Sequence, residues 1–258
     1  MKSMFVGVTF VLGLLAGGVG HATEPMKVPA YVAKAVADPS RASDASIDSR
    51  RKVAELTAFA GIKPGDKVLE LVPGSGYFTR VFSKVVGPKG HVYAVWPTEY
   101  NKESGDDSDK LRKLGTQAGY TNISVDIQPA AALTAPKPLD VVFTSQNYHD
   151  YPDKFMGPTD PAILNTAVFA ALKPGGVFVI VDHVAEAGSG LRDTDTLHRI
   201  DPDIVKTQVT AAGFVLEGES DVLRNPVDDH KRVVFDKSIR GHTDQFVFKF
   251  SKPKKTSH

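Results

Sequence analysis

Polar and titratable side chains gather directly after two apolar runs of this sequence. Thr144-Ser145-Gln146-Asn147-Tyr148-His149-Asp150 ends and follows one run, and Asp182-His183 follows the next one along the chain. If the two runs are neighbouring strands of a parallel sheet, these side chains meet where the strand backbones lie about 5 Å apart. A histidine beside a carboxylate can transfer protons near neutral pH, because the acid fixes its tautomer and tunes its pKa. His149, Asp150 and Asp182 are therefore candidate catalytic residues.

The same side chains are also compatible with metal binding and with a purely structural role. Histidine and carboxylate ligands suit zinc, iron or manganese, but the spacing matches no known metal motif, so we assign no metal ligand. Residues just past a strand also commonly satisfy the N–H groups of a loop, a structural role that carries equal weight. Further along, Asp201 before Pro202 has the pattern of a helix cap, which leaves His198 and Arg199 as candidate pocket residues, His198 with a catalytic role.

An apolar strand, a glycine turn and a helix start follow one another from Val68 to Thr79. The run Val68-Leu69-Glu70-Leu71-Val72 has the apolar character of a strand covered on both faces. Pro73-Gly74-Ser75-Gly76 stops this strand, because proline cannot donate to the ladder and glycine accepts positive φ. A helix that begins after such a turn presents free N–H groups and a positive dipole end to a polar or anionic ligand.

Strand-like and helix-like stretches alternate along the rest of the chain. This alternation predicts a doubly wound α/β fold with a mostly parallel, seven-stranded sheet, whose ligands bind beyond the carboxyl ends of the strands. A long connection over residues 225–243 is either a functional insertion or a solvated helix over residues 227–235. The predicted strands cover residues 68–72, 91–96, 123–127, 139–145, 177–181, 214–219 and 245–250. The predicted helices cover residues 44–60, with Ser43 as N-cap and Gly61 as stop, and then 77–86, 107–118, 161–172 and 203–212.

The first 22 residues predict an export signal. Lys2 gives a positive start, residues 5–16 form an apolar stretch, and Gly20-His21-Ala22 is a small-x-small cleavage site. We expect cleavage after Ala22 and a periplasmic or secreted protein, without stable membrane insertion, because the apolar stretch is short for a span of about 20 residues. The expected organisation is a signal peptide over residues 1–22, a lead over 23–43 and one domain over 44–258.

The composition excludes several kinds of partner and chemistry. The 31 Lys and Arg residues balance 30 Asp and Glu residues, so a net charge of +1 gives no field that favours nucleic acid or an anionic membrane. The absence of cysteine excludes disulfides and thiolate chemistry. A chain of 258 residues with 41% hydrophobic residues can bury one sizeable core. The expected partner is a small molecule, and the sequence does not specify an oligomeric state.

Three motifs, in order and spacing, resemble class I S-adenosylmethionine-dependent methyltransferases. They are Lys63-Pro64-Gly65-Asp66-Lys67-Val68-Leu69-Glu70 with the glycine turn behind it, Gly90-His91-Val92-Tyr93-Ala94-Val95, and Leu172-Lys173-Pro174-Gly175-Gly176 before a strand. The resemblance covers residues 47–181 and implies a Rossmann-like three-layer sandwich with an antiparallel ending. It also implies S-adenosylmethionine as the cofactor. The first 22 residues, residues 197–201 and the segment 225–252 resemble a bacterial group of exported, predicted methyltransferases.

The resemblance implies cofactor contacts at particular residues. Glu70 matches the acid that ends the first strand of this fold. Gly74 and Gly76, with Ser75 between them, match the turn against which the methionine part of the cofactor lies. Asn147, after the fourth strand, stands where this fold often places a residue that contacts the ligand.

The chain departs from the family pattern at three positions. The first turn glycine is Val72, the acid that usually holds both ribose hydroxyls falls on Trp96, and the acid that often meets the adenine falls near Pro129. Glu99 is the nearest replacement for the ribose acid. Each polar group left unpaired in a buried site costs about 1–3 kcal/mol. S-adenosylmethionine therefore meets an altered pocket.

Two functions remain open from the sequence. The first is methyl transfer from S-adenosylmethionine to a small molecule, with the cofactor over Gly74 and Gly76 and with His149 or Asp150 as base or orienting group. The second is a periplasmic protein of this fold that has lost the cofactor. It would act as a binding protein, or as a hydrolase-like enzyme that uses the His/Asp cluster with or without a metal.

Overall fold

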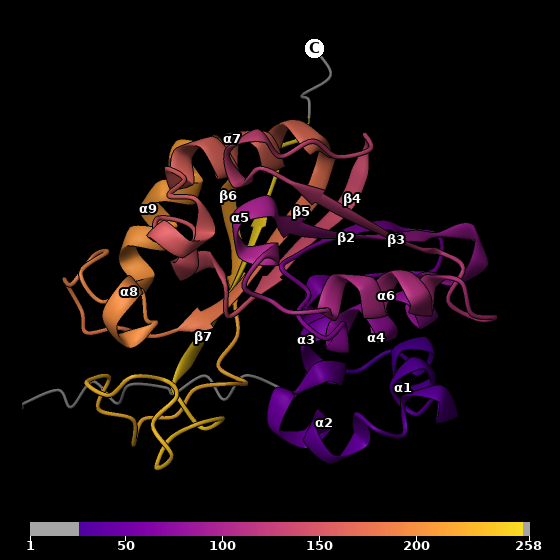
Figure 1. The fold of residues 1–258 in the computed structure, drawn as a ribbon, viewed down its shortest axis with the longest axis horizontal. Helices are drawn as coiled ribbons and strands as arrows, with labels where there is room; N and C mark the ends of the chain where they lie inside the picture. The colour runs from indigo at the N-terminus through magenta and orange to yellow at the C-terminus, as the bar shows by residue number, and fades with distance from the viewer. Residues whose placement is uncertain (1–25, 255–258) are drawn as a thin grey trace, which may run out of the picture.

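A seven-stranded sheet lies between two layers of helices in the computed structural model, which describes residues 26–254 (Figure 1). The strand order is β3-β2-β1-β4-β5-β7-β6, and only the pairings of β7 with β5 and β6 are antiparallel. This confirms the predicted α/β class, the seven strands and the antiparallel ending. The strands are β1 (Lys67–Leu71), β2 (His91–Pro97), β3 (Ile123–Gln128), β4 (Leu139–Ser145), β5 (Leu172–His183), β6 (Val215–Glu219) and β7 (Gln245–Ser251).

Helices cover both faces of the sheet. Figure 1 shows α7 and α9 on one side and α3, α4 and α6 on the other. The α-helices are α1 (Ala30–Val36), α2 (Ala45–Arg51), α3 (Val53–Ala60), α4 (Tyr77–Val86), α5 (Thr98–Asn101), α6 (Asp107–Gly115), α7 (Pro161–Ala171), α8 (Thr194–Leu197) and α9 (Pro202–Ala211). Short 3₁₀ turns are η1 (Pro39–Arg41), η2 (Gly87–Lys89), η3 (Ala130–Ala132), η4 (Tyr148–Asp150) and η5 (Lys154–Met156).

The central strands are buried on both faces, which explains their continuous apolar sequence. Successive side chains of a strand point to opposite faces of the sheet. Val68 of β1 accordingly packs into the apolar cluster that holds Phe78 and Phe82 of α4. Leu69, the next residue, packs into the cluster that holds Leu164 of α7. The strand therefore fixes both helical layers relative to the carboxyl edge of the sheet.

The single helix predicted over residues 44–60 is wrong, because the chain forms two helices there. Lys52 separates α2 from α3 and adopts the left-handed conformation, with φ of 51°. The two helices are held by different forces. α3 buries an apolar face, whereas α2 has no fully buried residue, packs only Ile47 against the core, and is fixed mainly by polar contacts such as the ion pair of its N-cap Asp44 with Arg80. Gly61 ends α3 in the left-handed conformation, as predicted.

The N-terminal part of the described chain packs against the sheet domain. Val32 and Ala35 of α1 are buried in the same apolar cluster as α4. The predicted signal peptide, residues 1–22, lies outside the described residues. Within residues 26–254, every helix is too short or too polar to cross a bilayer.

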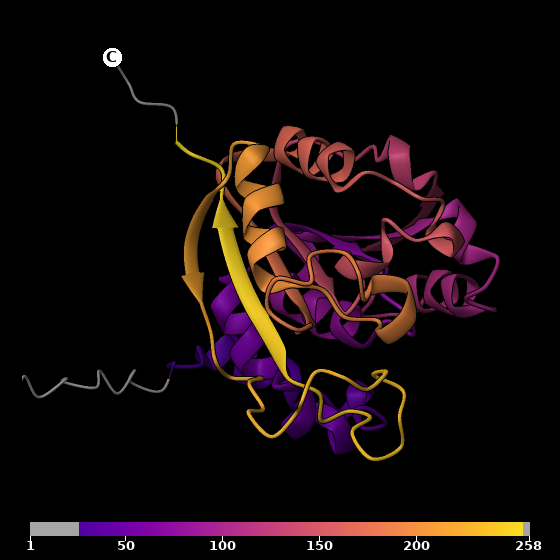
Figure 2. The ribbon, with the colours of Figure 1, turned by 90° about the vertical axis from the view of Figure 1, so that its left-hand side faces the viewer.

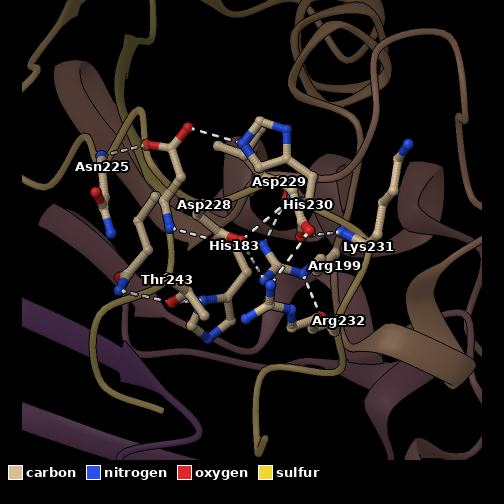
Figure 3. Close-up of polar contacts among 12 residues, drawn as sticks. His183, Arg199, Asn225, Asp228, Asp229, His230, Lys231, Arg232 and Thr243 are labelled. Atoms are coloured by element: carbon tan, nitrogen blue, oxygen red, sulfur yellow. Dashed lines mark hydrogen bonds and ion pairs between the residues drawn. The ribbon is translucent and has the colours of Figure 1, made fainter. Parts of the chain in front are cut away.

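The connection between β6 and β7 is irregular and lies beside α2 (Figures 1 and 2). No helix forms over residues 227–235, so the alternative of a solvated helix is wrong. A buried ion pair holds this segment instead. Arg199 donates to both carboxylate oxygens of Asp228, at 2.9 and 3.1 Å, and both side chains are fully buried (Figure 3). Arg199 also donates to the carbonyl oxygens of Val184 and Arg232, so one guanidinium ties the end of β5 to the connection.

Arg199→Leu is expected to lower the free energy of unfolding by about 3–5 kcal/mol, because it leaves the Asp228 carboxylate buried without its cation. Arg192→Leu is the matched control. The Arg192 side chain is 59% exposed, and its ion pairs with Glu186 and Asp193 should contribute little because solvent screens them. Urea unfolding of the two variants and the wild type measures both losses. Equal losses in both variants would contradict a special role for the buried pair.

Candidate functional site

The turn between β1 and α4 keeps a glycine-type backbone at three positions. Gly74 and Gly76 have φ of 56° and 78°, and Val72 has φ of 50°. The left-handed region suits glycine, but it costs an L-residue roughly 1–2 kcal/mol and is a genuine outlier for a β-branched side chain. Val72 therefore stands in the conformation of the glycine that it replaces, and the turn has the shape that the sequence motif predicted.

A cavity of about 200 Å³ lies above this turn, at the carboxyl ends of β1 and β4. Pockets for small molecules commonly measure about 300–1,000 Å³, so this cavity is small. The side chains of Val72 and Arg51 line it and reduce its volume. The lining comes from β1, the turn, the end of β4 and helices α2, α4 and α5: Arg51, Glu70, Val72, Pro73, Gly74, Ser75, Tyr77, Phe78, Tyr100, Ser145, Gln146 and Asn147.

Arg51 places a positive charge at the wall of this cavity. Its guanidinium carbon lies 5.2 Å from the ring centroid of Tyr77 and 5.0 Å from that of Phe78. It also donates to Gln146 Oε1 at 3.2 Å and to Ser145 Oγ at 3.4 Å. Burial lowers the pKa of Arg51, and the nearby Tyr77 and Glu70 partly offset that effect. A guanidinium in such a place fits a carboxylate group of a ligand.

Sequence reasoning missed Arg51. The only signal was the run Arg50-Arg51-Lys52 at the polar end of an amphipathic pattern, which is equally typical of a solvated helix face. The break at Lys52 places α2 on its own polar contacts, and it separates Arg51 from the buried face of α3.

Glu70 is a buried acid under the cavity. The residue is 3% exposed, and its Oε2 accepts a hydrogen bond of 2.6 Å from Thr79 Oγ1. Burial raises the pKa of Glu70 to about 8, although the hydrogen bond from Thr79 and the charge of Arg51 act in the opposite direction. Glu70 therefore holds a proton over much of the neutral range.

Of the other residues implied by the resemblance, some line the cavity and one does not. Ser75 and Asn147 line the cavity, and Asn147 Nδ2 donates to the carbonyl oxygens of Val72, at 3.2 Å, and Ser145, at 2.6 Å. Glu99 is not among the lining residues. Its side chain packs against Gly157, and its Oε2 is buried without a hydrogen-bond partner in residues 26–254.

Trp96 and Pro129 also lie away from the cavity. Trp96 is fully buried in the apolar cluster that includes α4, and its indole N–H has no hydrogen-bond partner within the described chain. Pro129 lines a separate small hollow beside Gln128 and Leu133. The aromatic side chain on the α5 side of the cavity is that of Tyr100.

A second group of polar side chains lies just beyond the ends of β4 and β5. His149 Nδ1 is 2.7 Å from Asp182 Oδ1, and His149 Nε2 is 2.9 Å from Asp150 Oδ1. The Asp182 carboxylate also accepts the backbone N–H groups of His149 and His183, at 2.9 and 2.8 Å. The predicted meeting of His149, Asp150 and Asp182 therefore occurs in the structure, and Asp182 orients His149 through two contacts.

His198, rather than His183, completes this cluster. His198 Nδ1 lies 3.3 Å from Asp150 Oδ1 and 3.4 Å from His149 Nε2. The His183 ring is 6.1 Å from that of His149, and His183 Nδ1 is hydrogen-bonded to Thr243 Oγ1 at 2.8 Å (Figure 3). Strand neighbourhood predicted that His183 would join the group. The register explains the difference, because adjacent residues of a strand point to opposite faces.

The charges of the cluster balance one another. Burial alone would lower the pKa of His149, but Asp182 and Asp150 outweigh it and raise this pKa to about 10. Burial would raise the pKa of Asp150, but His149 and His198 lower it below the usual value. His183 lies outside the group, and burial lowers its pKa to about 3, which keeps its imidazole neutral.

The family model for protein-L-isoaspartate(D-aspartate) O-methyltransferase (PCMT) matches residues 21–181. This match covers more than half of the chain, including β1, the glycine turn, the end of β4 and β5 as far as Val181. The chain belongs to the PCMT family. Its relation to this family agrees with the resemblance of the sequence motifs to class I methyltransferases.

Individual relatives match over part of their length. A protein-L-isoaspartate O-methyltransferase from Ignicoccus hospitalis is 28% identical over 136 residues, which cover 52% of this chain and 56% of that protein. The ubiquinone/menaquinone biosynthesis C-methyltransferase UbiE from Vibrio cholerae is 28% identical over 196 residues, covering 74% and 63%. The chain thus spans less than two thirds of these relatives' length.

Comparison with a solved structure indicates the same fold as the strand order of the sheet. An S-adenosylmethionine-dependent methyltransferase from Aquifex aeolicus has a TM-score of 0.57 and 18% identity, and covers 86% of this chain and 98% of that one. A likeness at this identity establishes the class I methyltransferase fold. It does not assign an acceptor.

Glu70→Gln is expected to remove a pH dependence of stability. The folded state raises the pKa of Glu70 from 4.5 to about 8, so it binds a proton that the unfolded state has released between these values. Wild-type stability should therefore fall by about 1.4 kcal/mol per unit as pH rises through this window, relative to Glu70→Gln. Urea unfolding at pH 5.5 and 7.5 measures the slope, with exposed Glu103→Gln as control. A Glu70→Gln slope parallel to that of wild type would contradict the assignment.

Proposed function

We propose that the chain binds S-adenosylmethionine and transfers its methyl group to a small molecule. The observation that carries the proposal is the turn between β1 and α4, in which Val72, Gly74 and Gly76 all have left-handed φ beneath a cavity. This conformation is kept at Val72 in spite of its steric cost, which indicates that the shape of the turn matters. Membership of the PCMT family supports the same activity.

The residues of the cavity fit the methionine half of the cofactor. A Cβ added to Gly74 would meet no atom within 4 Å, so the backbone there is open to a ligand. Arg51 offers a guanidinium for the carboxylate, and Asn147 and Ser75 offer polar groups beside the turn. When bound, S-adenosylmethionine supplies a methyl group on a positively charged sulfur.

The ribose half of the cofactor would meet different groups. Tyr100 of α5 lines the cavity. Glu99, the residue before Tyr100, lies just after the end of β2. The unpartnered Oε2 of Glu99 is an acceptor that a ribose hydroxyl could satisfy after the side chain turns away from Gly157. We therefore keep Glu99, and not Trp96, as the ribose residue of the proposal.

The chain itself contributes position and charge. Tyr77, Phe78 and Val72 supply apolar surface to the cavity, and Arg51 would orient the ligand. Alignment of a donor with an acceptor can supply about 7–11 kcal/mol of a barrier, so positioning would account for most of the rate. The cluster of His149, Asp150, Asp182 and His198 begins two residues beyond Asn147 and would hold the acceptor or its proton.

The acceptor we propose is a small molecule. The names of the two relatives described above point to different acceptors, one a protein isoaspartate and the other a compound of ubiquinone/menaquinone biosynthesis. The histidine–aspartate cluster is almost wholly buried, and only the His198 side chain, at 23% exposed, reaches the surface. Burial of this kind favours a small acceptor. We also propose export with cleavage after Ala22, on the sequence of residues 1–22.

A second candidate function is supported by the small cavity. Val72 and Arg51 occupy part of the space above the turn, and the fully buried Trp96 gives no carboxylate to a ribose. A protein of this fold without the cofactor would act through the histidine–aspartate cluster, as a binding protein or a hydrolase-like enzyme. Binding of the cofactor distinguishes the two candidates.

Calorimetry of the protein with S-adenosylmethionine and S-adenosylhomocysteine is expected to give one site per chain. Gly74→Ala should weaken both by at least tenfold, because its Cβ would project into the open space above the turn. Gly61→Ala is the matched control, since Gly61 also has positive φ and open space but ends α3 away from the cavity. An isoaspartyl peptide, added with cofactor, tests the alternative acceptor. No heat at high micromolar ligand would exclude the methyltransferase proposal and leave the second candidate.

Val72→Gly is expected to strengthen cofactor binding several-fold. The substitution frees space in the cavity that Val72 lines, which favours binding. It also relieves the left-handed strain of roughly 1–2 kcal/mol, which raises the stability of the free and the bound protein alike. Val72→Ala separates these two effects, because it frees some space but keeps the strain. Titration with S-adenosylhomocysteine should therefore rank the affinities Gly above Ala above Val. Weaker binding by Val72→Gly would show that the valine contributes to the site.

A further inference from the structure

The histidine–aspartate cluster contains three ligand atoms that face one another. These are His149 Nε2, Asp150 Oδ1 and His198 Nδ1, and the distances between them are 2.9, 3.3 and 3.4 Å. Zinc and similar ions bind nitrogen and oxygen ligands at about 2.0–2.2 Å, so two ligands of one ion lie about 3.0 Å apart at right angles and about 3.4 Å apart at the tetrahedral angle. The three measured distances match this range.

The orientation of His149 is set from outside this triangle. Asp182 Oδ1 lies 2.7 Å from His149 Nδ1, and the Asp182 side chain is fully buried. A carboxylate that accepts the Nδ1–H of a histidine directs Nε2 at a metal ion, which takes the place of the Nε2 proton on binding, and this arrangement accompanies most metal-binding histidines. Asp182 is in turn fixed by the backbone N–H groups of His149 and His183. His149 Nε2 is therefore held toward Asp150 and His198.

His198 reaches the cluster through a backbone conformation that is rare for residues other than glycine. It ends α8 with φ of 53°, in the left-handed region, where a non-glycine residue costs about 1–2 kcal/mol. The next residue, Arg199, is locked to Asp228 by the buried ion pair (Figure 3). The rings of Phe155 and Phe235 lie 6.2 and 4.8 Å from the His198 ring. The fold thus positions a third ligand at a conformational cost.

We propose that His149, Asp150 and His198 bind a divalent transition-metal ion, with Asp182 as the outer carboxylate that orients His149. Two histidines and one carboxylate form the donor set that suits zinc, iron and manganese. The two charges of the ion would balance the carboxylates of Asp150 and Asp182. Three protein ligands leave coordination positions open, as catalytic rather than structural sites do, and these positions would take an oxygen of a small-molecule ligand. This inference does not rest on methyl transfer.

The test is calorimetric titration of chelator-treated protein with ZnCl₂. We expect about one ion per chain and a rise in melting temperature on binding. His198→Gln, at the exposed side of the cluster, should weaken zinc binding at least tenfold, and His149→Gln should do the same. Asp182→Asn should weaken it by about 10–100-fold without removing a ligand.

His91→Gln is the matched control. His91 is a half-buried histidine that starts β2 at the opposite edge of the sheet and is hydrogen-bonded to Ser124. Its substitution should leave zinc affinity unchanged. Absence of zinc binding in the wild type would overturn the proposal, and so would an isotherm that survives in both His198→Gln and His149→Gln. Equal weakening in His91→Gln would place the ion elsewhere and overturn it too. Circular dichroism of each variant verifies the fold, and the partly exposed His198 provides a variant whose substitution does not open the core.

Discussion

The parallel pairing of β1, β4 and β5 is the constraint on which both parts of the site depend. Leu71 of β1 lies beside Thr144 of β4, and Ser145 of β4 lies beside Val181 of β5. All three strands therefore end at one edge, where their connections must leave the sheet. The glycine turn after β1 and the histidine–aspartate cluster after β4 and β5 become neighbours through backbone hydrogen bonds. The strand pairing alone is sufficient to bring the two parts to the same edge.

Sequence periodicity predicted this frame well, because each central strand is buried on both faces and each connection has its own turn residues. Helix α4 and strand β4 have the bounds that the apolar pattern predicted. The turn conformation was also predictable, since Gly74 and Gly76 follow a strand directly. Val72 was identified as a departure, but its left-handed φ could be known only from the structure.

The contacts that the sequence could not foresee are long-range: Arg51 was missed altogether, and His198 was predicted as a site residue but without its partners. Arg51 reaches the cavity because α2 is held by polar partners from residues far along the chain, such as Arg80. His198 reaches His149 because Arg199, beside it, is anchored to Asp228 in the β6–β7 connection. Neither contact is signalled by a pattern in the neighbouring sequence. Both place a charged or titratable side chain at the edge that the strands define, which is why the edge was predictable and its complete set of residues was not.

The position of β7 has a consequence for the order of assembly. Although β7 is the last strand along the chain, it lies between β5 and β6, and residues 182 and 183 of β5 pair with Phe246 and Gln245 (Figure 2). The backbone that carries Asp182 is thus completed only when residues 245–251 dock. In a chain that is synthesised from its N-terminus, the glycine turn can fold early, but the histidine cluster must wait for the final segment. A chain that is still being synthesised therefore lacks the complete cluster.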